Sequence, residues 1–140
     1  MKIRLLILAL FVSTLVSYSS NAKFYDINTI HGINMREVAS ICKDKDGFIW
    51  ASSKTGIIRL SEDNYHIYQL PYKTADVIHV KLVHDNGILL AFTNNGQLFS
   101  YNVLTDKFDI VIDLRNHLRD SNVMVNNILI DPHGSFLIAT

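Results

Sequence analysis

Two histidines stand near each other in the sequence and raise the question of a metal site. His79 and His84 are five residues apart in a stretch that is typical of a β-strand. Because successive side chains of a strand alternate between its faces, this spacing places the two rings on opposite faces. No third ligand follows at a spacing that zinc would use. We therefore expect ordinary strand or turn histidines, with no metal and no other cofactor.

A second candidate for metal binding is the acidic turn that ends at Gly47. Asp44 and Asp46 resemble the start of a calcium loop. If Gly47 takes the sixth position of such a loop, Cys42 occupies the first and Ser53 the twelfth, where an acidic ligand and a bidentate glutamate are required. The sequence therefore favours a tight turn over a calcium site.

Nucleophilic or acid–base catalysis needs groups that converge, and the candidates here are scattered. Cys42 follows Ile41 within an apolar strand, which favours a buried thiol. His117 lacks the long helix and the nucleotide-binding domain that accompany a phosphorylated histidine. The carboxylates that a hydrolase or lyase could use are Asp109, Asp113 and Asp120. They are spread along one segment, and we expect no catalytic residue in this chain.

Aromatic side chains could instead stack on a carbohydrate ring. Trp50 is the only tryptophan, but its neighbours Phe48 and Ile49 favour a position in the core. Tyrosines gather on or near the last strand of the first repeat, at Tyr65, Tyr68 and Tyr72. An exposed tyrosine strip would suit a sugar or a second subunit, whereas half-buried packing is the default for this residue type. The ligand-binding residues stay open.

The elements that position these residues follow an export signal. A basic start, the apolar run 5–16 and the small residues Ser20 and Ala22 come in that order. This layout predicts a signal-peptide helix over residues 1–22, with cleavage before Lys23. The apolar run is shorter than the roughly 20 residues of a membrane-spanning helix, so a retained anchor is the lesser alternative.

The composition excludes several classes of protein. The chain of 140 residues has 13 basic and 13 acidic residues, and the signal peptide contains basic residues only, so the exported part is slightly negative. Such a chain cannot neutralise a nucleic-acid backbone. The single cysteine excludes a disulfide scaffold. With 49% hydrophobic and 10% aromatic residues, the chain is folded rather than disordered.

Three segments of the chain repeat one another. They align on Gly47, Gly87 and Gly134, which are 40 and 47 residues apart. An apolar residue follows each glycine at +3, a hydroxyl at +6 and, in the first two segments, a second glycine at +9. These positions are Trp50, Leu90 and Leu137, then Ser53, Thr93 and Thr140, then Gly56 and Gly96. A repeat of this length indicates a modular fold.

Each of the first two repeats is predicted to contain four strands. The first four cover 38–43, 48–53, 57–60 and 65–70, and the next four cover 77–83, 88–93, 97–101 and 108–114. Asn-Gly pairs at 86–87 and 95–96 predict type I′ hairpins, in which both central residues need positive φ. Helix signals are almost absent, apart from one turn over 115–120.

Several predicted strands are apolar on both faces and need a packed layer on each side. Antiparallel four-stranded units that stack face to face form a β-propeller, whereas a β-sandwich or barrel would not explain the repeated glycine and hydroxyl positions. We predict an all-β fold of propeller blades at about 31–71, 73–115 and, in part, 120–140. About two and a half blades make an incomplete ring, which indicates the first part of a longer protein.

The first repeat resembles a known family. The stretch 31–60 is similar to the opening blade of the two-component regulator propeller family, whose pattern is Asp-x-x-Gly-x-Leu-Trp-x-Gly-Thr-x-x-Gly-Leu-x-Arg. Ser52-Ser53 replaces the Gly-Thr of that pattern. The resemblance extends over about 24–140 and is weaker in the later repeats, where Leu90 and Leu137 replace the tryptophan.

The resemblance implies a periplasmic sensor of a hybrid two-component system. In this family a pair of propellers binds a glycan fragment, and a β-sandwich stalk and one membrane helix lead to a cytoplasmic histidine kinase with receiver and DNA-binding domains. None of these later parts has a counterpart in residues 1–140. The resemblance also implies that 24–27 adds a closing strand to the final blade, and that the full-length protein is a homodimer anchored in the inner membrane.

We therefore expect a non-catalytic, ligand-binding part of a sensor that recognises an oligosaccharide. The alternatives are a secreted propeller enzyme, such as a polysaccharide lyase or hydrolase, and an extracellular interaction module without a signalling partner. Sequence beyond Thr140 would distinguish the three, because only a sensor needs a membrane helix and a kinase after its blades.

Overall fold

A computed structural model describes most of the chain after the predicted signal peptide. The described residues are 26, 28–29, 32–33, 35–54, 56–61, 64–71, 77, 79–118 and 124–140. The predicted cleavage position between Ala22 and Lys23, and the candidate residues Tyr72 and Asp120, lie outside them. No helix within the described ranges is long and apolar enough to cross a membrane.

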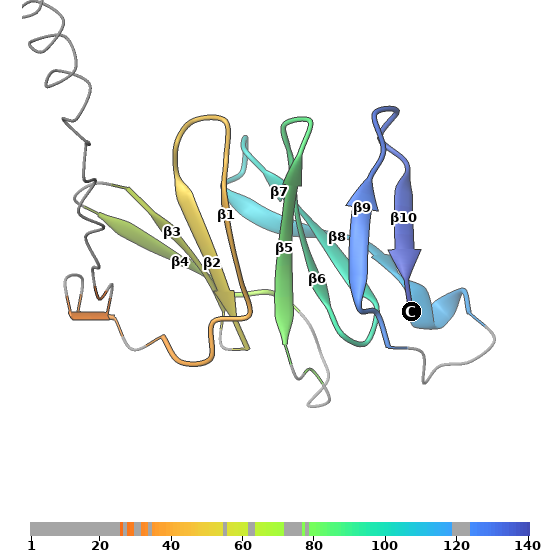
Figure 1. Cartoon of the computed structure of the whole chain (residues 1–140), viewed down its shortest axis with the longest axis horizontal. Helices are drawn as coiled ribbons and strands as arrows, with labels where there is room; N and C mark the ends of the chain where they lie inside the picture. The colour runs from red at the N-terminus through yellow and green to blue at the C-terminus, as the bar shows by residue number, and fades with distance from the viewer. Residues whose placement is uncertain are drawn as a thin grey trace, which may run out of the picture.

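The described chain is all-β, as predicted, and forms two four-stranded antiparallel sheets and a hairpin (Figure 1). Sheet 1 contains β1 (Ser40–Lys43), β2 (Ile49–Ser53), β3 (Gly56–Leu60) and β4 (Tyr65–Tyr68). Sheet 2 contains β5 (Val80–Asp85), β6 (Ile88–Thr93), β7 (Gln97–Asn102) and β8 (Lys107–Asp113). A 3-10 turn, η1 (Leu114–Asn116), and the hairpin of β9 (Asn127–Ile130) and β10 (Phe136–Ala139) follow. Each sheet keeps the order of its strands in the sequence, so the four-strand repeat is confirmed.

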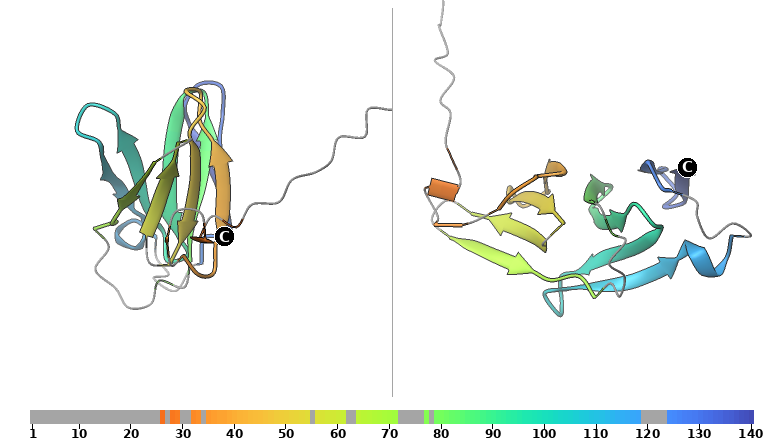
Figure 2. Two further views of the ribbon diagram at one scale, coloured as in Figure 1. Left: turned by 90° about the vertical axis from the view of Figure 1, so that its left-hand side faces the viewer. Right: turned by 90° about the horizontal axis from the view of Figure 1, so that it is seen from below.

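The three units lie side by side as layers, with sheet 2 in the middle (Figure 2). Their first strands are neighbours, because β1 contacts β5 and β5 contacts β9. We call the contact between sheets 1 and 2 the first junction, and the contact between sheet 2 and the β9–β10 hairpin the second junction. Each has its own apolar core.

Sheet 2 is buried on both faces because neighbours cover it on both sides. Ala91 and Phe99 belong to the core of the first junction. The next residues along the same strands, Phe92 and Leu98, belong to the core of the second junction. All four side chains have no more than 1% of their surface exposed. The two-sided burial that the apolar run 88–92 predicts is therefore confirmed.

The first glycine of each repeat lies in the turn that joins the first two strands. In repeats one and three the turn has five residues, and the carboxylates of Asp44 and Asp131 organise it. Asp44 Oδ1 accepts hydrogen bonds from the amides of Asp46 and Phe48, at 2.9 and 3.0 Å. Asp131 Oδ1 does the same for the amides two and four residues later. Gly47 has a φ of 92°, which residues other than glycine rarely adopt.

The two Asn-Gly pairs fold differently. Asn86 and Gly87 both have positive φ, 49° and 77°, and form the predicted two-residue hairpin between Asp85 and Ile88. At 95–96 only the glycine has positive φ, so the predicted type I′ turn is wrong there. The hydroxyl of Thr93 donates to the Asn95 side chain and accepts from the Gln97 amide at 3.1 Å, which stabilises a longer connection.

The repeated hydroxyl also differs between repeats. Ser53 and Thr93 are fully buried at the end of the second strand of their sheets, whereas Thr140 is exposed and follows the end of β10. The predicted helical turn after sheet 2 is present, although it covers Leu114–Asn116 rather than 115–120. Asp113 caps it, since its carboxylate accepts the amide hydrogen of Arg115.

Candidate ligand pocket and the first junction

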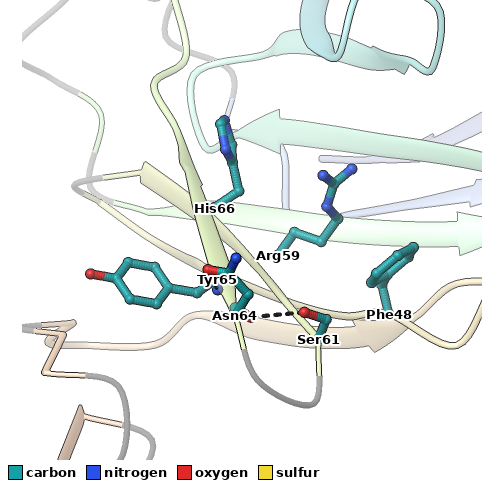
Figure 3. Close-up of a pocket in the computed structure, with 6 residues that line it drawn as sticks. All are labelled: Phe48, Arg59, Ser61, Asn64, Tyr65 and His66. Atoms are coloured by element: carbon teal, nitrogen blue, oxygen red, sulfur yellow. Dashed lines mark hydrogen bonds between the residues drawn. The ribbon is translucent and has the colours of Figure 1, made fainter.

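A polar pocket of about 190 Å³ opens on sheet 1 beside the loop that joins β3 to β4 (Figure 3). Its lining residues come from β3, β4 and the two adjoining turns. They are Phe48, Arg59, Ser61, Asn64, Tyr65 and His66. The pocket thus combines aromatic rings, a guanidinium and several neutral hydrogen-bonding groups. Pockets for drug-sized ligands measure roughly 300 to 1,000 Å³, so this one can hold a single terminal unit of a larger molecule.

The register of sheet 1 explains how these side chains meet. Trp50 pairs with Arg59 and Arg59 pairs with His66 across adjacent strands, so all three extend from one face of the sheet. Tyr65 is offset by one residue and extends from the opposite face (Figure 3). At the base of the β3–β4 connection, the amide and the hydroxyl of Ser61 both donate to the carbonyl oxygen of Asn64.

Arg59 forms the inner wall of the pocket and is held by three aromatic rings. Its guanidinium carbon lies 5.1 Å from the ring centre of Phe48 and 5.5 Å from those of Trp50 and Tyr68. The face of an aromatic ring attracts a cation at such distances. The Arg59 side chain is 25% exposed, so its charge is accessible from the pocket while its position is restrained.

Behind the pocket, Asp106 joins the two sheets. One of its oxygens, Oδ1, accepts hydrogen bonds from Arg59 Nη1 at 3.2 Å, from the Tyr68 hydroxyl at 2.7 Å and from the Tyr101 hydroxyl at 2.6 Å. Arg59 Nη1 also donates to the Tyr101 oxygen at 2.7 Å. Arg59 and Tyr68 belong to sheet 1, whereas Tyr101 and Asp106 belong to β7 and the turn after it. The network therefore ties the pocket to sheet 2.

The network changes the acidity of its members. The hydroxyls of Tyr101 and then Tyr68, with Arg59 nearby, hold the pKa of Asp106 below its usual value, so the carboxylate is charged at neutral pH. Burial first, and the hydrogen bond to Asp106 second, raise the pKa of both tyrosines. Asp106 has a φ of 51°, a left-handed conformation that is uncommon for residues other than glycine. Its side chain points towards the two tyrosines.

Trp50 lies in the core of the first junction, as its neighbours predict, with 1% of its surface exposed. Its ring contacts Tyr101 edge-on at 4.8 Å and Phe108 at 6.0 Å between centres. Its indole nitrogen donates to Asp44 Oδ2 at 2.7 Å. Because the other oxygen of Asp44 accepts turn amides, this carboxylate is engaged within the turn, as the sequence favours over a calcium site.

A serine pair adds a second polar connection between the sheets. The hydroxyl of Ser52 donates to the carbonyl oxygen of Val80 at 2.7 Å and lies 2.8 Å from the hydroxyl of Ser40. Ser40 in turn accepts the amide hydrogen of Leu82 at 2.6 Å. This contact is not evident from the local sequence. Its only signal was Ser52 at a position where the resembled family has glycine.

The other candidate residues do not converge. Burial, and next the charge of Asp44, raises the pKa of the Cys42 thiol to about 11, which keeps it protonated at neutral pH. Asp109 accepts from Asn102, whereas Asp113 binds Arg115 and Gln97. His117 ends η1 through its backbone amide. Within the described ranges, no three His, Cys, Asp or Glu side chains lie close enough to hold a metal ion together, and His79 and His84 belong to no such group.

The predicted tyrosine strip divides between two roles. Tyr68 is 5% exposed and belongs to the core of the first junction, whereas Tyr65 is 39% exposed and lines the pocket. Tyr68 is therefore buried more deeply than the half-buried default for these residues, whereas Tyr65 remains partly exposed. Arg59 and Asp106 were missed as site residues, because they are 47 positions apart and only the folded sheets bring them together.

Comparisons of this chain with protein-family models, with curated proteins and with solved structures gave no match.

Proposed function

We propose that sheets 1 and 2 are consecutive blades of a β-propeller, exported to the periplasm, that senses the end of an oligosaccharide for a two-component signalling system. Two features support the blade interpretation. Both sheets have four antiparallel strands in sequence order, and their first strands lie next to each other. The stretch 31–60 also resembles the opening blade of a sensor propeller family. We place the ligand in the pocket that contains Arg59.

The pocket has the chemistry that a sugar unit requires. A sugar ring presents hydroxyls around its rim and C–H groups on its faces. Arg59 supplies donors to hydroxyl oxygens, and Asn64 and Ser61 supply both donors and acceptors. The ring of Phe48 supplies an apolar surface. No other pocket function is favoured by a comparable set of groups in the described part of the chain.

The position of Arg59 carries the proposal, because this residue contacts both the pocket and sheet 2. Its Nη1 atom already bonds to Tyr101 and Asp106 across the first junction. A ligand that draws the guanidinium towards the pocket lengthens these bonds and changes how the two sheets pack. Binding is thereby converted into a movement between blades, which is the kind of change that a sensor can transmit.

The proposal is tested by screening the labelled protein on an array of bacterial, plant and host oligosaccharides, followed by calorimetry on the strongest hit. Asn64→Ala and His66→Ala alter exposed pocket residues and should each weaken binding about 10-fold. Arg36→Ala removes an exposed arginine outside the pocket and should leave the affinity unchanged. Equal affinity in all variants, or an array without hits, would contradict the proposal.

A secreted enzyme remains the alternative, but no observation favours it over a sensor. Asp109 and Asp113 bond to different partners, and neither is among the residues that line the pocket.

A further inference from the structure

The guanidinium of Arg59 uses only one of its nitrogen atoms in the contact with sheet 2. Its hydrogen bonds to the Tyr101 hydroxyl, at 2.7 Å, and to Asp106 Oδ1, at 3.2 Å, both start from Nη1. A guanidinium has five N–H donors, and three of them belong to Nε and Nη2. Among the described residues, these three donors have no hydrogen-bond acceptor. The Nε–Nη2 edge of Arg59 is therefore the part that a ligand can bind.

That edge suits a carboxylate better than a hydroxyl. Nε and Nη2 carry two parallel N–H groups in one plane, and the two oxygens of a carboxylate accept both at once. Hydrogen bonds between charged groups are also roughly twice as strong as those between neutral groups. A sugar hydroxyl presents a single neutral oxygen, so it uses the two parallel donors less well.

The Arg59 side chain is already held in place for such a contact. Its guanidinium carbon lies 5.1 Å from the ring centre of Phe48, and the two bonds of Nη1 restrain its far side. The side chain is 25% exposed. Because a side chain that is ordered before binding loses little rotamer freedom, less of the contact energy is spent on ordering it.

The charges around the pocket favour an anion. None of the six lining side chains carries a carboxylate, and His66 adds a second nitrogen-bearing side chain on the same face of the sheet as Arg59. Asp106 does not line the pocket. Its Oδ1 already accepts three hydrogen bonds, which stabilise its negative charge. The charge that the lining residues present to a ligand is therefore positive.

We propose that the ligand unit in this pocket is a hexuronate, an acidic sugar whose carboxylate binds the Nε–Nη2 edge of Arg59. This inference rests on the proposed function and adds to it the charge of the sugar that is recognised. The pocket of about 190 Å³ has room for one such unit. The Phe48 ring packs against its C–H groups, and Ser61 and Asn64 bind its hydroxyls.

The negative charge of the ligand also provides a way to act on the first junction. Asp106 Oδ1 lies 3.2 Å from Arg59 Nη1 but 2.7 and 2.6 Å from the hydroxyls of Tyr68 and Tyr101, so the bond to Arg59 is the longest of the three. A second carboxylate attracts the guanidinium towards the pocket and competes with Asp106 for it. A neutral sugar lacks this attraction.

The test compares disaccharides that differ only in the charge of the terminal unit, by calorimetry with the full chain. The first ends in glucuronate, the second in the methyl ester of that unit and the third in glucose, and a parallel set uses the galactose series. The ester has nearly the shape of the acid but no charge. We expect the uronate of at least one series to bind about 30-fold more tightly than its ester. Added salt should weaken the binding of the uronate more than that of the ester.

The outcomes separate this inference from the function on which it rests. Equal affinities for the uronate, the ester and the hexose would overturn the inference and leave the proposed function standing. If none of the probes bound, both would be overturned.

Two arginine variants locate the contact. Arg59→Lys retains a positive charge but lacks the planar fork, so the preference for the uronate over its ester should fall about 10-fold. Arg36→Lys makes the same change at an exposed site outside the pocket and should leave the preference unaltered. An unchanged preference in Arg59→Lys would overturn the proposal. The comparison of acid and ester in the wild type decides the charge preference even if Arg59→Lys does not fold.

A third variant addresses the acidic residues Glu62 and Asp63, which follow Ser61 in the sequence and lie outside the described residues. Glu62→Gln combined with Asp63→Asn removes two negative charges, so the affinity for the uronate should stay the same or rise. Weaker binding of the uronate would overturn its direct contact with Arg59, because it would show that these carboxylates take part in holding the ligand.

Discussion

The two junctions use the same positions of the repeat but different chemistry. In the first, the aromatic rings of Trp50, Tyr68, Tyr101 and Phe108 surround a charged network, and Phe99 belongs to the same core. The core of the second consists of Phe92 and the aliphatic side chains of Leu98, Leu114, Val125 and Ile128, with Phe136 packed against them. The difference originates at the +3 position, where repeat one has Trp50 and repeat two has Leu90. A tryptophan there brings a polar atom into the junction, and the surrounding side chains satisfy it.

This contrast has a physical consequence. Aliphatic packing is non-directional, so the second junction depends mainly on buried area and tolerates similar residues. Hydrogen bonds in the first junction fix the register of the two sheets, and their loss leaves polar groups without partners. Substitutions at comparable positions of the two junctions should therefore lower the unfolding free energy by different amounts.

The largest effect is expected for Trp50→Leu, which gives the first junction the residue of the second. Loss of the ring opens a cavity among Tyr68, Tyr101 and Phe108, and should cost about 3 kcal/mol of unfolding free energy. Urea unfolding of dilute protein measures it. The matched control Leu90→Met should cost less than about 1.5 kcal/mol. Equal losses in the two variants would contradict the difference between the junctions.

Ser52→Ala should have the next largest effect. It removes the donor to the buried carbonyl oxygen of Val80, and we expect a loss of about 1 to 2 kcal/mol. Lys81→Met removes the donor to the carbonyl oxygen of Asn126 in the second junction, at an exposed site, and we expect a loss of less than about 1 kcal/mol. Both values come from thermal or urea unfolding. A larger loss for Lys81→Met would show that the second junction is the more directional one.

Single substitutions around Asp106 should each cause a smaller loss of unfolding free energy, and these losses should be strongly coupled. Tyr68→Phe and Tyr101→Phe each remove one hydrogen bond to Oδ1, and each should lower the unfolding free energy by about 1 kcal/mol. In the Asp106→Asn background, which retains a side chain that tolerates positive φ, both losses should shrink. A double-mutant cycle measures this coupling. Additive losses would mean that the three groups do not act as one network.

The smallest predicted effect is a loss of stability at low pH. The folded pKa of Asp106 is lowered, so the carboxylate contributes stability above its unfolded pKa, and this contribution is lost as pH falls through about 4 towards the folded value. Because the side chain is 46% exposed, the change is modest. Melting curves between pH 7 and pH 3 should show a smaller acid loss for Asp106→Asn than for wild type. Identical pH profiles would contradict the network.

The strands and their order were predictable because their signals are local. Apolar and β-branched runs and turn glycines fall within a few positions of each other, and the two sheets follow the predicted ranges within three residues. The Asn-Gly turn at 95–96 was wrong because the Thr93 hydroxyl stabilises a longer connection, and a side-chain hydrogen bond of this kind overrides the dipeptide preference.

The contacts between sheets were not predictable in the same way. Trp50 was correctly placed in the core from its apolar neighbours. Its partners Tyr101 and Phe108, however, come from the next repeat, more than 50 positions away. Arg59 belongs to the motif of the resembled family, but nothing local indicates that it would bind Asp106. Such contacts depend on how two complete sheets stack, which no single window of the sequence determines.

The central claim is that the first junction buries Trp50 between two stacked sheets, and the fluorescence of this residue tests it most directly. Trp50 is the only tryptophan, so its emission reports on the junction alone. The structure predicts blue-shifted emission that acrylamide quenches poorly, and a change to water-like emission in urea. Emission of a water-exposed indole in the native protein, fully accessible to acrylamide, would contradict the account.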